Sequence, residues 1–135
     1  MIFKDKKLSE ITFSGWGKLE GDFIWSISKY ASLLVPIKKQ SKSFGLQFVV
    51  EPFVNQELNI IQDIEIFCNG IFILGQTSSL LKQEILFVEI HHSLSNFEAL
   101  KLDFRFPNAA SPKKLKVSED QRLLAYKLFE FQLIN

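Results

Sequence analysis

Several residue types are scarce in this chain of 135 residues. It has a single cysteine, Cys68, so no internal disulfide can form and nothing indicates an oxidising compartment. Neither sign of charge is in excess, because 16 Lys and Arg oppose 15 Asp and Glu. The net charge of +1 gives no general electrostatic case for binding nucleic acid or an anionic membrane.

Long apolar runs are absent as well. No stretch has enough consecutive apolar residues to span a bilayer. The start of the chain, MIFKDKKLSE, mixes charges with single apolar residues, unlike a signal peptide. We therefore expect a cytoplasmic protein that reaches the inner face of the membrane only through a partner.

The composition that remains is that of a folded globule. Hydrophobic residues make up 47% and charged residues 23%, which excludes an intrinsically disordered chain. A chain of this length buries about two-thirds of its unfolded surface, so we expect a single domain over residues 1–135. Its 14 Phe against 2 Tyr indicate a core filled by rings that need no hydrogen-bond partner.

Alternation of apolar and polar residues predicts strands throughout. In LKLDFRF, residues 100–106, four apolar side chains share one face and three charged side chains share the other. Pro107 cannot donate to a ladder, so this strand should end before it. The segment 122–134 also has apolar residues at helical spacing, but its alternating Phe129 and Phe131 favour a strand. Further strands are predicted over residues 22–28, 31–37, 45–53 and 84–92.

A tight hairpin is predicted at Asn69 and Gly70, because both residues accept the positive φ that a type I′ turn needs. A two-residue turn sets the register of the flanking strands. Ile66 should then face Ile73, and Ile71 should join Ile73 in the core.

These patterns predict the fold class. We expect an all-β protein, an antiparallel β-sandwich of jelly-roll type with seven or eight strands. The most irregular stretch, residues 107–120, is a loop of a length that usually carries either function or a fixed packing role.

Residues that could carry catalysis are few. His91 and His92 would point to opposite faces of a strand, which is unsuitable for one metal ion, and Cys68 lies on an apolar face without a neighbouring base. Neither GxSxG nor a phosphate-binding glycine loop occurs. Carboxylate pairs such as Asp63 with Glu65 would serve a glycosidase only across a cleft of set width, and are otherwise surface charges. We predict a protein that is not an enzyme and has neither cofactor nor bound metal.

The two tryptophans are open to two interpretations. Trp faces stack on sugar rings, so Trp16 and Trp25 in a β-sandwich support carbohydrate binding. Trp is also a common core residue, and either ring could serve packing alone.

The segment SEDQR has two interpretations as well. Asp120 and Arg122 lie two apart, hence on one side of an extended segment. They could pair with each other or pin the loop by hydrogen bonds to backbone amides. Alternatively, Arg122 could hold an anionic or hydroxyl-rich ligand.

Several motifs follow one another along nearly the whole chain. The first is SGWGKLEGDFIWS, which is followed by ASLLVPI, by a strand ending in EPF, and by the Asn-Gly hairpin with Gly75 behind it. The last and most specific is SPKKLKVSEDQRLL, residues 111–124. In these motifs the chain resembles a small β-sandwich module of bacterial cell-surface polysaccharide synthesis, often appended to glycosyltransferases of capsule or lipopolysaccharide clusters. The matched positions are Gly15, Trp16, Glu20 and Trp25, then Ser111, Pro112, Leu115, Ser118, Asp120, Arg122 and Leu124.

Two positions depart from that pattern. Similar modules usually carry Arg before the second Trp, where this chain has Ile24, and often Gly after Leu115, where it has Lys116. The first departure leaves no arginine at that position to contact a ligand. The second predicts an altered loop.

The resemblance implies a non-catalytic sandwich in a glycan-assembly setting. Together with the two tryptophans and the SEDQR corner, it leads us to predict an accessory domain that binds or positions a saccharide. The alternative is a module that docks onto a glycosyltransferase or forms a homo-oligomer, since strands such as GLQFVVEPF carry little charge. The residues predicted to contact a saccharide are Trp16, Glu20, Trp25, Asn69, Ser118, Asp120 and Arg122.

Overall fold

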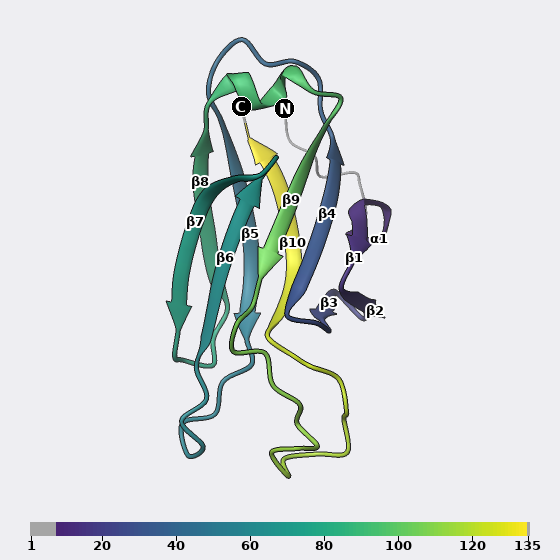
Figure 1. Ribbon diagram of the computed structural model, residues 1–135, viewed down its shortest axis with the longest axis vertical. Coiled ribbons are helices and arrows are strands. Elements are labelled where there is room, and N and C mark those ends of the chain that lie inside the picture. Colours follow the sequence, from purple (N-terminus) through teal and green to yellow (C-terminus); the bar gives the residue numbers. More distant parts are fainter. Residues whose placement is uncertain (1–7, 135) are drawn as a thin grey trace.

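Two antiparallel sheets pack face to face in the computed structural model, which describes residues 8–134 (Figure 1). One sheet has the strand order β1-β4-β9-β6-β7, and the other has the order β2-β3-β10-β5-β8. We call them the first and the second sheet. The predicted all-β sandwich is therefore confirmed.

The described strands number ten, against the seven or eight predicted. The two additional strands, β1 and β2, are short and mostly exposed, so they lack the alternation that marked the others. The first sheet consists of β1 (Thr12–Ser14), β4 (Tyr30–Pro36), β9 (Ala99–Arg105), β6 (Gln62–Cys68) and β7 (Ile71–Ser78). The second consists of β2 (Trp16–Glu20), β3 (Phe23–Ser26), β10 (Tyr126–Ile134), β5 (Phe44–Pro52) and β8 (Glu84–Ile90).

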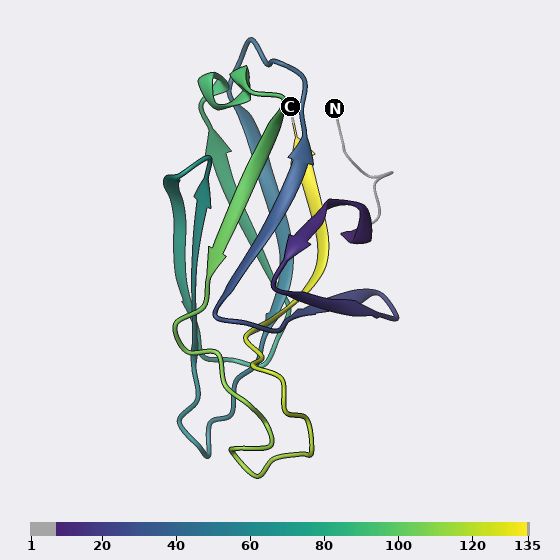
Figure 2. The same ribbon diagram turned by 45° about the vertical axis from the view of Figure 1, so that its right-hand side comes forward.

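Within the described residues, helical structure is limited to two short segments, α1 (Leu8–Ile11) and the 3-10 helix η1 (His92–Asn96). No helix in the described part of the chain has the length and apolarity to cross a membrane. The β2–β3 hairpin projects from one side of the sandwich, below α1 and β1 (Figure 2).

The core lies between the sheets. On β9, Leu102 and Phe104 are buried whereas Lys101 and Arg105 are exposed, which confirms the predicted alternation. Phe48 of β5 meets Phe104 edge to face, with ring centroids 5.7 Å apart. Each such ring stabilises the fold by about 2–3 kcal/mol through burial, so the two sheets are held mainly by their inner faces.

The predicted two-residue hairpin between β6 and β7 forms, with both turn residues at positive φ. Cys68 pairs with Ile71, but a register shift beside Ile66 sets Ile66 opposite Leu74 instead of Ile73. Ile71 is 54% exposed, so its assignment to the core was wrong. The reason is that β7 is an edge strand whose inner face is only partly covered.

The C-terminal segment is a strand and not a helix, as favoured, although β10 begins only at Tyr126. A register shift between Leu128 and Glu130 interrupts its alternation. Leu128 and Phe131 are therefore both buried, while Phe129 turns to the outer face of the second sheet.

Candidate functional site

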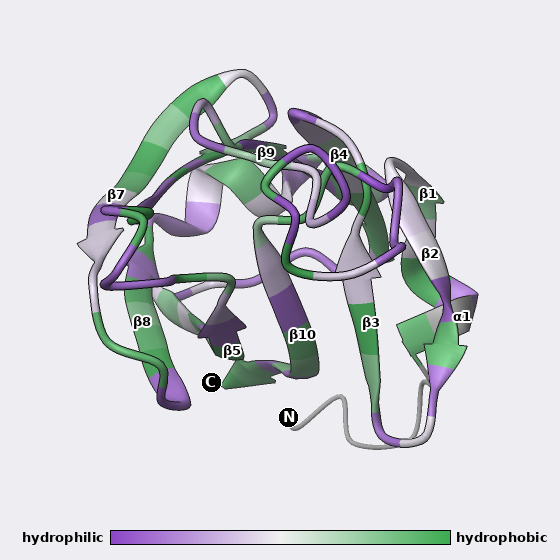
Figure 3. Cartoon of the chain, turned by 90° about the horizontal axis from the view of Figure 1, so that it is seen from below, coloured by the Kyte–Doolittle hydropathy of each residue, from purple (hydrophilic) through white to green (hydrophobic). Residues whose placement is uncertain are grey.

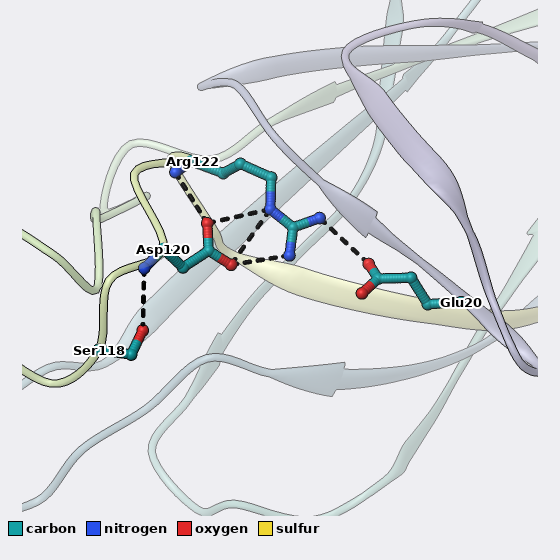
Figure 4. Close-up of polar contacts among 4 residues, drawn as sticks. All are labelled: Glu20, Ser118, Asp120 and Arg122. Carbon is teal, nitrogen blue, oxygen red and sulfur yellow. Dashed lines mark hydrogen bonds and ion pairs between the residues drawn. The ribbon is translucent and has the colours of Figure 1, made fainter.

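Four of the seven predicted ligand residues meet at one corner of the molecule. Glu20 ends β2, and Ser118, Asp120 and Arg122 lie in the loop between β9 and β10 (Figure 4). The Arg122 Nη1 donates to Glu20 Oε2 at 3.1 Å, and its Nη2 donates to Asp120 Oδ2 at 2.7 Å. The guanidinium thus joins the loop to the β2–β3 hairpin, and we call this group the Arg122 corner.

The loop itself holds Asp120 in place. The backbone N–H of Arg122 donates to Asp120 Oδ1 at 3.0 Å, and the backbone N–H of Asp120 donates to Ser118 Oγ at 3.2 Å. Hydrogen bonds from Arg122 lower the pKa of the Asp120 carboxyl, and the bond to Asp120 raises the pKa of the Arg122 guanidinium. The predicted pairing and pinning of the loop are both confirmed.

Trp25 lies on the outer face of the second sheet, close to this corner. Its ring is half-buried and meets Phe23 and Phe53 edge to face, each with centroids 6.3 Å apart. Lys127 Nζ stands 5.3 Å from the Trp25 ring centroid and 3.3 Å from Glu51 Oε2. The result is an aromatic patch with a paired charge at its centre.

The corner and this patch are neighbours. A Cβ placed on Gly17 of β2 would lie 3.5 Å from Arg122 Nη1 and 3.7 Å from the Trp25 carbonyl oxygen. Arg122 therefore packs against β2 beside the backbone of Trp25.

Two predicted ligand residues lie elsewhere. Trp16 packs edge to face on Phe104 with centroids 5.4 Å apart, and its Nε1 donates to Ser32 O at 3.0 Å. The turn between β6 and β7, which contains Asn69, lies at the opposite end of the sandwich from the β9–β10 loop (Figure 1). There Asn69 Oδ1 accepts from Lys101 N at 2.8 Å. Both side chains have partners that serve packing and turn formation.

The cysteine and the two histidines that were considered for catalysis or metal binding lie in surroundings that do not form such a site. Cys68 is buried, and desolvation raises the pKa of its thiol to about 11. The expectation that His91 and His92 point to opposite faces of a strand was wrong, because β8 ends at Ile90 and the two rings lie 4.3 Å apart. Within residues 8–134 no group of three or more His, Cys, Asp or Glu is placed to hold a metal ion.

Lys116 occupies the loop position where similar modules often have glycine. It adopts φ +60, the left-handed conformation that glycine takes at little cost. Its backbone N–H donates to Lys113 O at 3.0 Å, so the loop makes its turn there with a lysine. That the loop differs from those of similar modules stays a prediction.

A hollow of about 440 Å³ on the first sheet, where β6 and β7 approach Pro107, was not predicted from the sequence. Its lining includes Asp63, Glu65, Phe72 and Gly75. In the sequence, Asp63 and Glu65 were noted as a carboxylate pair and Gly75 as a residue behind the hairpin, but nothing there placed them beside Phe72.

Comparisons with known proteins address the fold. The sequence matches no family model, and no curated protein is similar to it in sequence. The CBM36-1 domain of a multidomain xylanase from the hindgut metagenome of Trinervitermes trinervoides superposes with a TM-score of 0.54 at 7% identity, over 95% of this chain and 92% of that one. A CBM4 structure superposes with a TM-score of 0.50 at 10% identity, over 98% of this chain and 84% of that one.

This chain has the fold of these two carbohydrate-binding modules. Dimeric latent PorU from Porphyromonas gingivalis superposes with a TM-score of 0.47 at 13% identity. The match covers 82% of this chain but only 10% of PorU. At sequence identities this low, the structural similarity to the two modules shows the small β-sandwich fold and nothing finer.

Proposed function

We propose that this domain is a non-catalytic module that binds or positions a saccharide in bacterial surface-polysaccharide synthesis. The observation that carries the proposal is the meeting of Glu20, Asp120 and Arg122 beside the sheet face that bears Trp25. These groups come from segments 102 residues apart.

The chemistry of the Arg122 corner suits a hydroxyl-rich ligand. The side chains of Glu20 and Arg122 are 42% and 36% exposed, so both can reach a ligand while they remain paired. Each carboxylate has lone pairs left to accept sugar hydroxyls. The half-buried Trp25 ring supplies apolar surface for the carbon face of a sugar. Polar groups beside an aromatic ring are the usual components of a saccharide site.

The setting rests on the motif resemblance. It suggests a glycosyltransferase as the associated protein, and we propose that the module works on the cytoplasmic side, at the membrane only through that partner. The likeness in fold to two carbohydrate-binding modules supports a binding role over catalysis.

The test is an NMR titration of amide and indole resonances with nucleotide sugars and bacterial polysaccharide fragments. We expect saturable shifts at the Trp25 indole and at residues 118–122, weakened in Arg122→Gln. The matched control is Arg105→Gln, which removes a paired arginine from the first sheet and should leave the shifts at the Trp25 indole and at residues 118–122 unchanged. Absence of any shift across the panel would contradict saccharide binding.

A second candidate function is docking onto a protein partner. The edge strands β7 and β8 and the connection between them lie along one side of the sandwich (Figure 3), and exposed apolar side chains occur in that connection and at the start of β8. Exposed apolar surface marks interaction sites where it forms a patch. Light scattering after size exclusion should then show a dimer that Leu81→Lys dissociates, and a monomer at all concentrations would contradict self-association. The residues concerned are Leu80, Leu81 and Ile85.

A further inference from the structure

We infer that the hollow beside β7 is a second ligand site, which takes an uncharged sugar ring against Phe72. The inference goes beyond the proposed role of the Arg122 corner, because this hollow lies on the other sheet and shares no residue with that corner. It extends the proposed saccharide binding to a second surface and does not require the corner to bind.

The aromatic wall of the hollow depends on a glycine. Phe72 and Gly75 both lie on β7, and a Cβ at Gly75 would be 3.0 Å from Phe72 Cζ. The ring therefore leans over the backbone at Gly75, where an ordinary side chain would push it away. Phe67 meets the ring from β6 with centroids 5.6 Å apart at 72°, which holds it at the side. Phe72 is still 55% exposed, so its outward surface is free for contact.

The polar rim follows from the register of β6 and β7. Glu65 pairs with Gly75, and Asp63 pairs with Thr77 two residues farther along. Paired residues project to the same face, so both carboxylates stand beside the leaning ring. Successive positions on one face are about 7 Å apart, so the two side chains can contact different hydroxyls of one bound sugar.

These polar groups are oriented but retain acceptor capacity. Asp63 Oδ1 accepts from Thr77 Oγ1 at 2.5 Å, and Asp63 Oδ2 accepts from Asn108 Nδ2 at 2.9 Å. Glu65 Oε1 lies 3.5 Å from Arg105 Nη1. Each carboxylate oxygen accepts two hydrogen bonds, so both residues can still receive hydroxyl donors.

The charge at the rim selects among sugars. Asp63 and Glu65 contribute two negative charges, and Arg105 offsets one of them. A uronic acid or a phosphorylated sugar would meet an uncompensated carboxylate and no unpaired cation among the lining residues. The site therefore favours uncharged sugars, whose hydroxyls donate to the carboxylates.

The experiment follows backbone amides of the ¹⁵N-labelled chain during titration with xylotriose, cellotriose and maltotriose, and with trigalacturonate as the acidic counterpart. We expect at least one neutral trisaccharide to shift the amides of residues 63–65 and 72–77. Phe72→Ala should weaken that binding roughly five- to tenfold, and Phe72→Tyr should restore it.

Phe87→Ala is the matched control. Phe87 is 54% exposed and also lies against a glycine, since a Cβ at Gly45 would be 2.5 Å from its ring, but it belongs to the other sheet. Its loss should leave the shifts at 72–77 unchanged.

The possible results separate the two proposals. Shifts confined to the Trp25 indole and residues 118–122 would overturn the second site and leave the proposed function standing. No shift anywhere with any of these sugars would count against both. Full binding in Phe72→Ala, or tighter binding of trigalacturonate than of the neutral sugars, would overturn this inference alone.

Discussion

The Arg122 corner and the Phe72 hollow lie on different sheets and are built in opposite ways. In the corner, Glu20 and Asp120 already hold the guanidinium, so its charge is paired within the protein and the contact fastens loop to hairpin. In the hollow, Phe72 leaves more than half of its surface exposed over a glycine. The corner should therefore contribute to the stability of the fold as well as to ligand binding. The hollow, in contrast, can be altered with little loss of stability.

The largest loss of stability is expected at Gly15, which directly precedes β2, the strand that carries Glu20 of the corner. Gly15 has φ +80, and a Cβ there would lie 2.1 Å from Tyr30 O, so Gly15→Ala must displace the backbone that leads into β2. We expect a loss of roughly 3 kcal/mol in the free energy of unfolding, measured by urea denaturation. Gly21→Ala is the control, because Gly21 has φ +72 with no atom within 4 Å of the added Cβ, and should lose about 1 kcal/mol. Equal losses in the two variants would refute the steric explanation.

Removing the guanidinium of the corner should have a smaller effect. Arg122→Gln breaks the contacts with Glu20 and Asp120, but these side chains are about one-third exposed and screened by solvent, so we expect a loss of about 1 kcal/mol. Amide resonances of residues 72–77 should stay in place. Arg105→Gln removes a longer and more exposed ion pair, 3.5 Å from Glu65, and should cost less. If Arg105→Gln lowered the free energy of unfolding as much as Arg122→Gln, the Arg122 corner would stabilise the fold no more than an ordinary surface ion pair.

Acid should distinguish the corner from the rest of the molecule. Hydrogen bonds from Arg122 lower the pKa of Asp120 below its ordinary 3.8 in the folded protein. The unfolded chain therefore binds this proton first as pH falls, so the stabilisation is present above the ordinary pKa and is lost as pH drops through the folded pKa. Unfolding free energies measured from about pH 6 downwards should fall more steeply in the parent protein than in Arg122→Gln. If the free energies of unfolding of the two proteins fell in parallel with pH, Asp120 would contribute nothing to the acid dependence of stability.

The smallest change in stability is expected in the hollow. In Gly75→Ala the new Cβ, 3.0 Å from Phe72 Cζ, must move the ring by a few tenths of an ångström, and an exposed ring can yield. We expect the free energy of unfolding to change by no more than about 0.5 kcal/mol, while the Phe72 ring protons shift in NMR spectra. Unchanged ring protons would show that the ring does not lean on Gly75.

Local signals accounted for much of the fold. The alternation on β9 and the Asn69-Gly70 turn were read correctly because both depend on residues adjacent in sequence. The register shift beside Ile66 and the one after Leu128 were missed, since a bulge has no reliable local signature and one extra residue changes which side chains face the core.

The sequence by itself determined three features: the strands, the turn at residues 69–70 and the pairing of Asp120 with Arg122. Each of them depends on neighbours one or two residues apart. Only the tertiary structure decided that Glu20 would reach Arg122 and that Trp16 and Asn69 would lie away from that corner. The physical reason is that strand order and register bring distant segments together, and neither is written in any one segment of the chain.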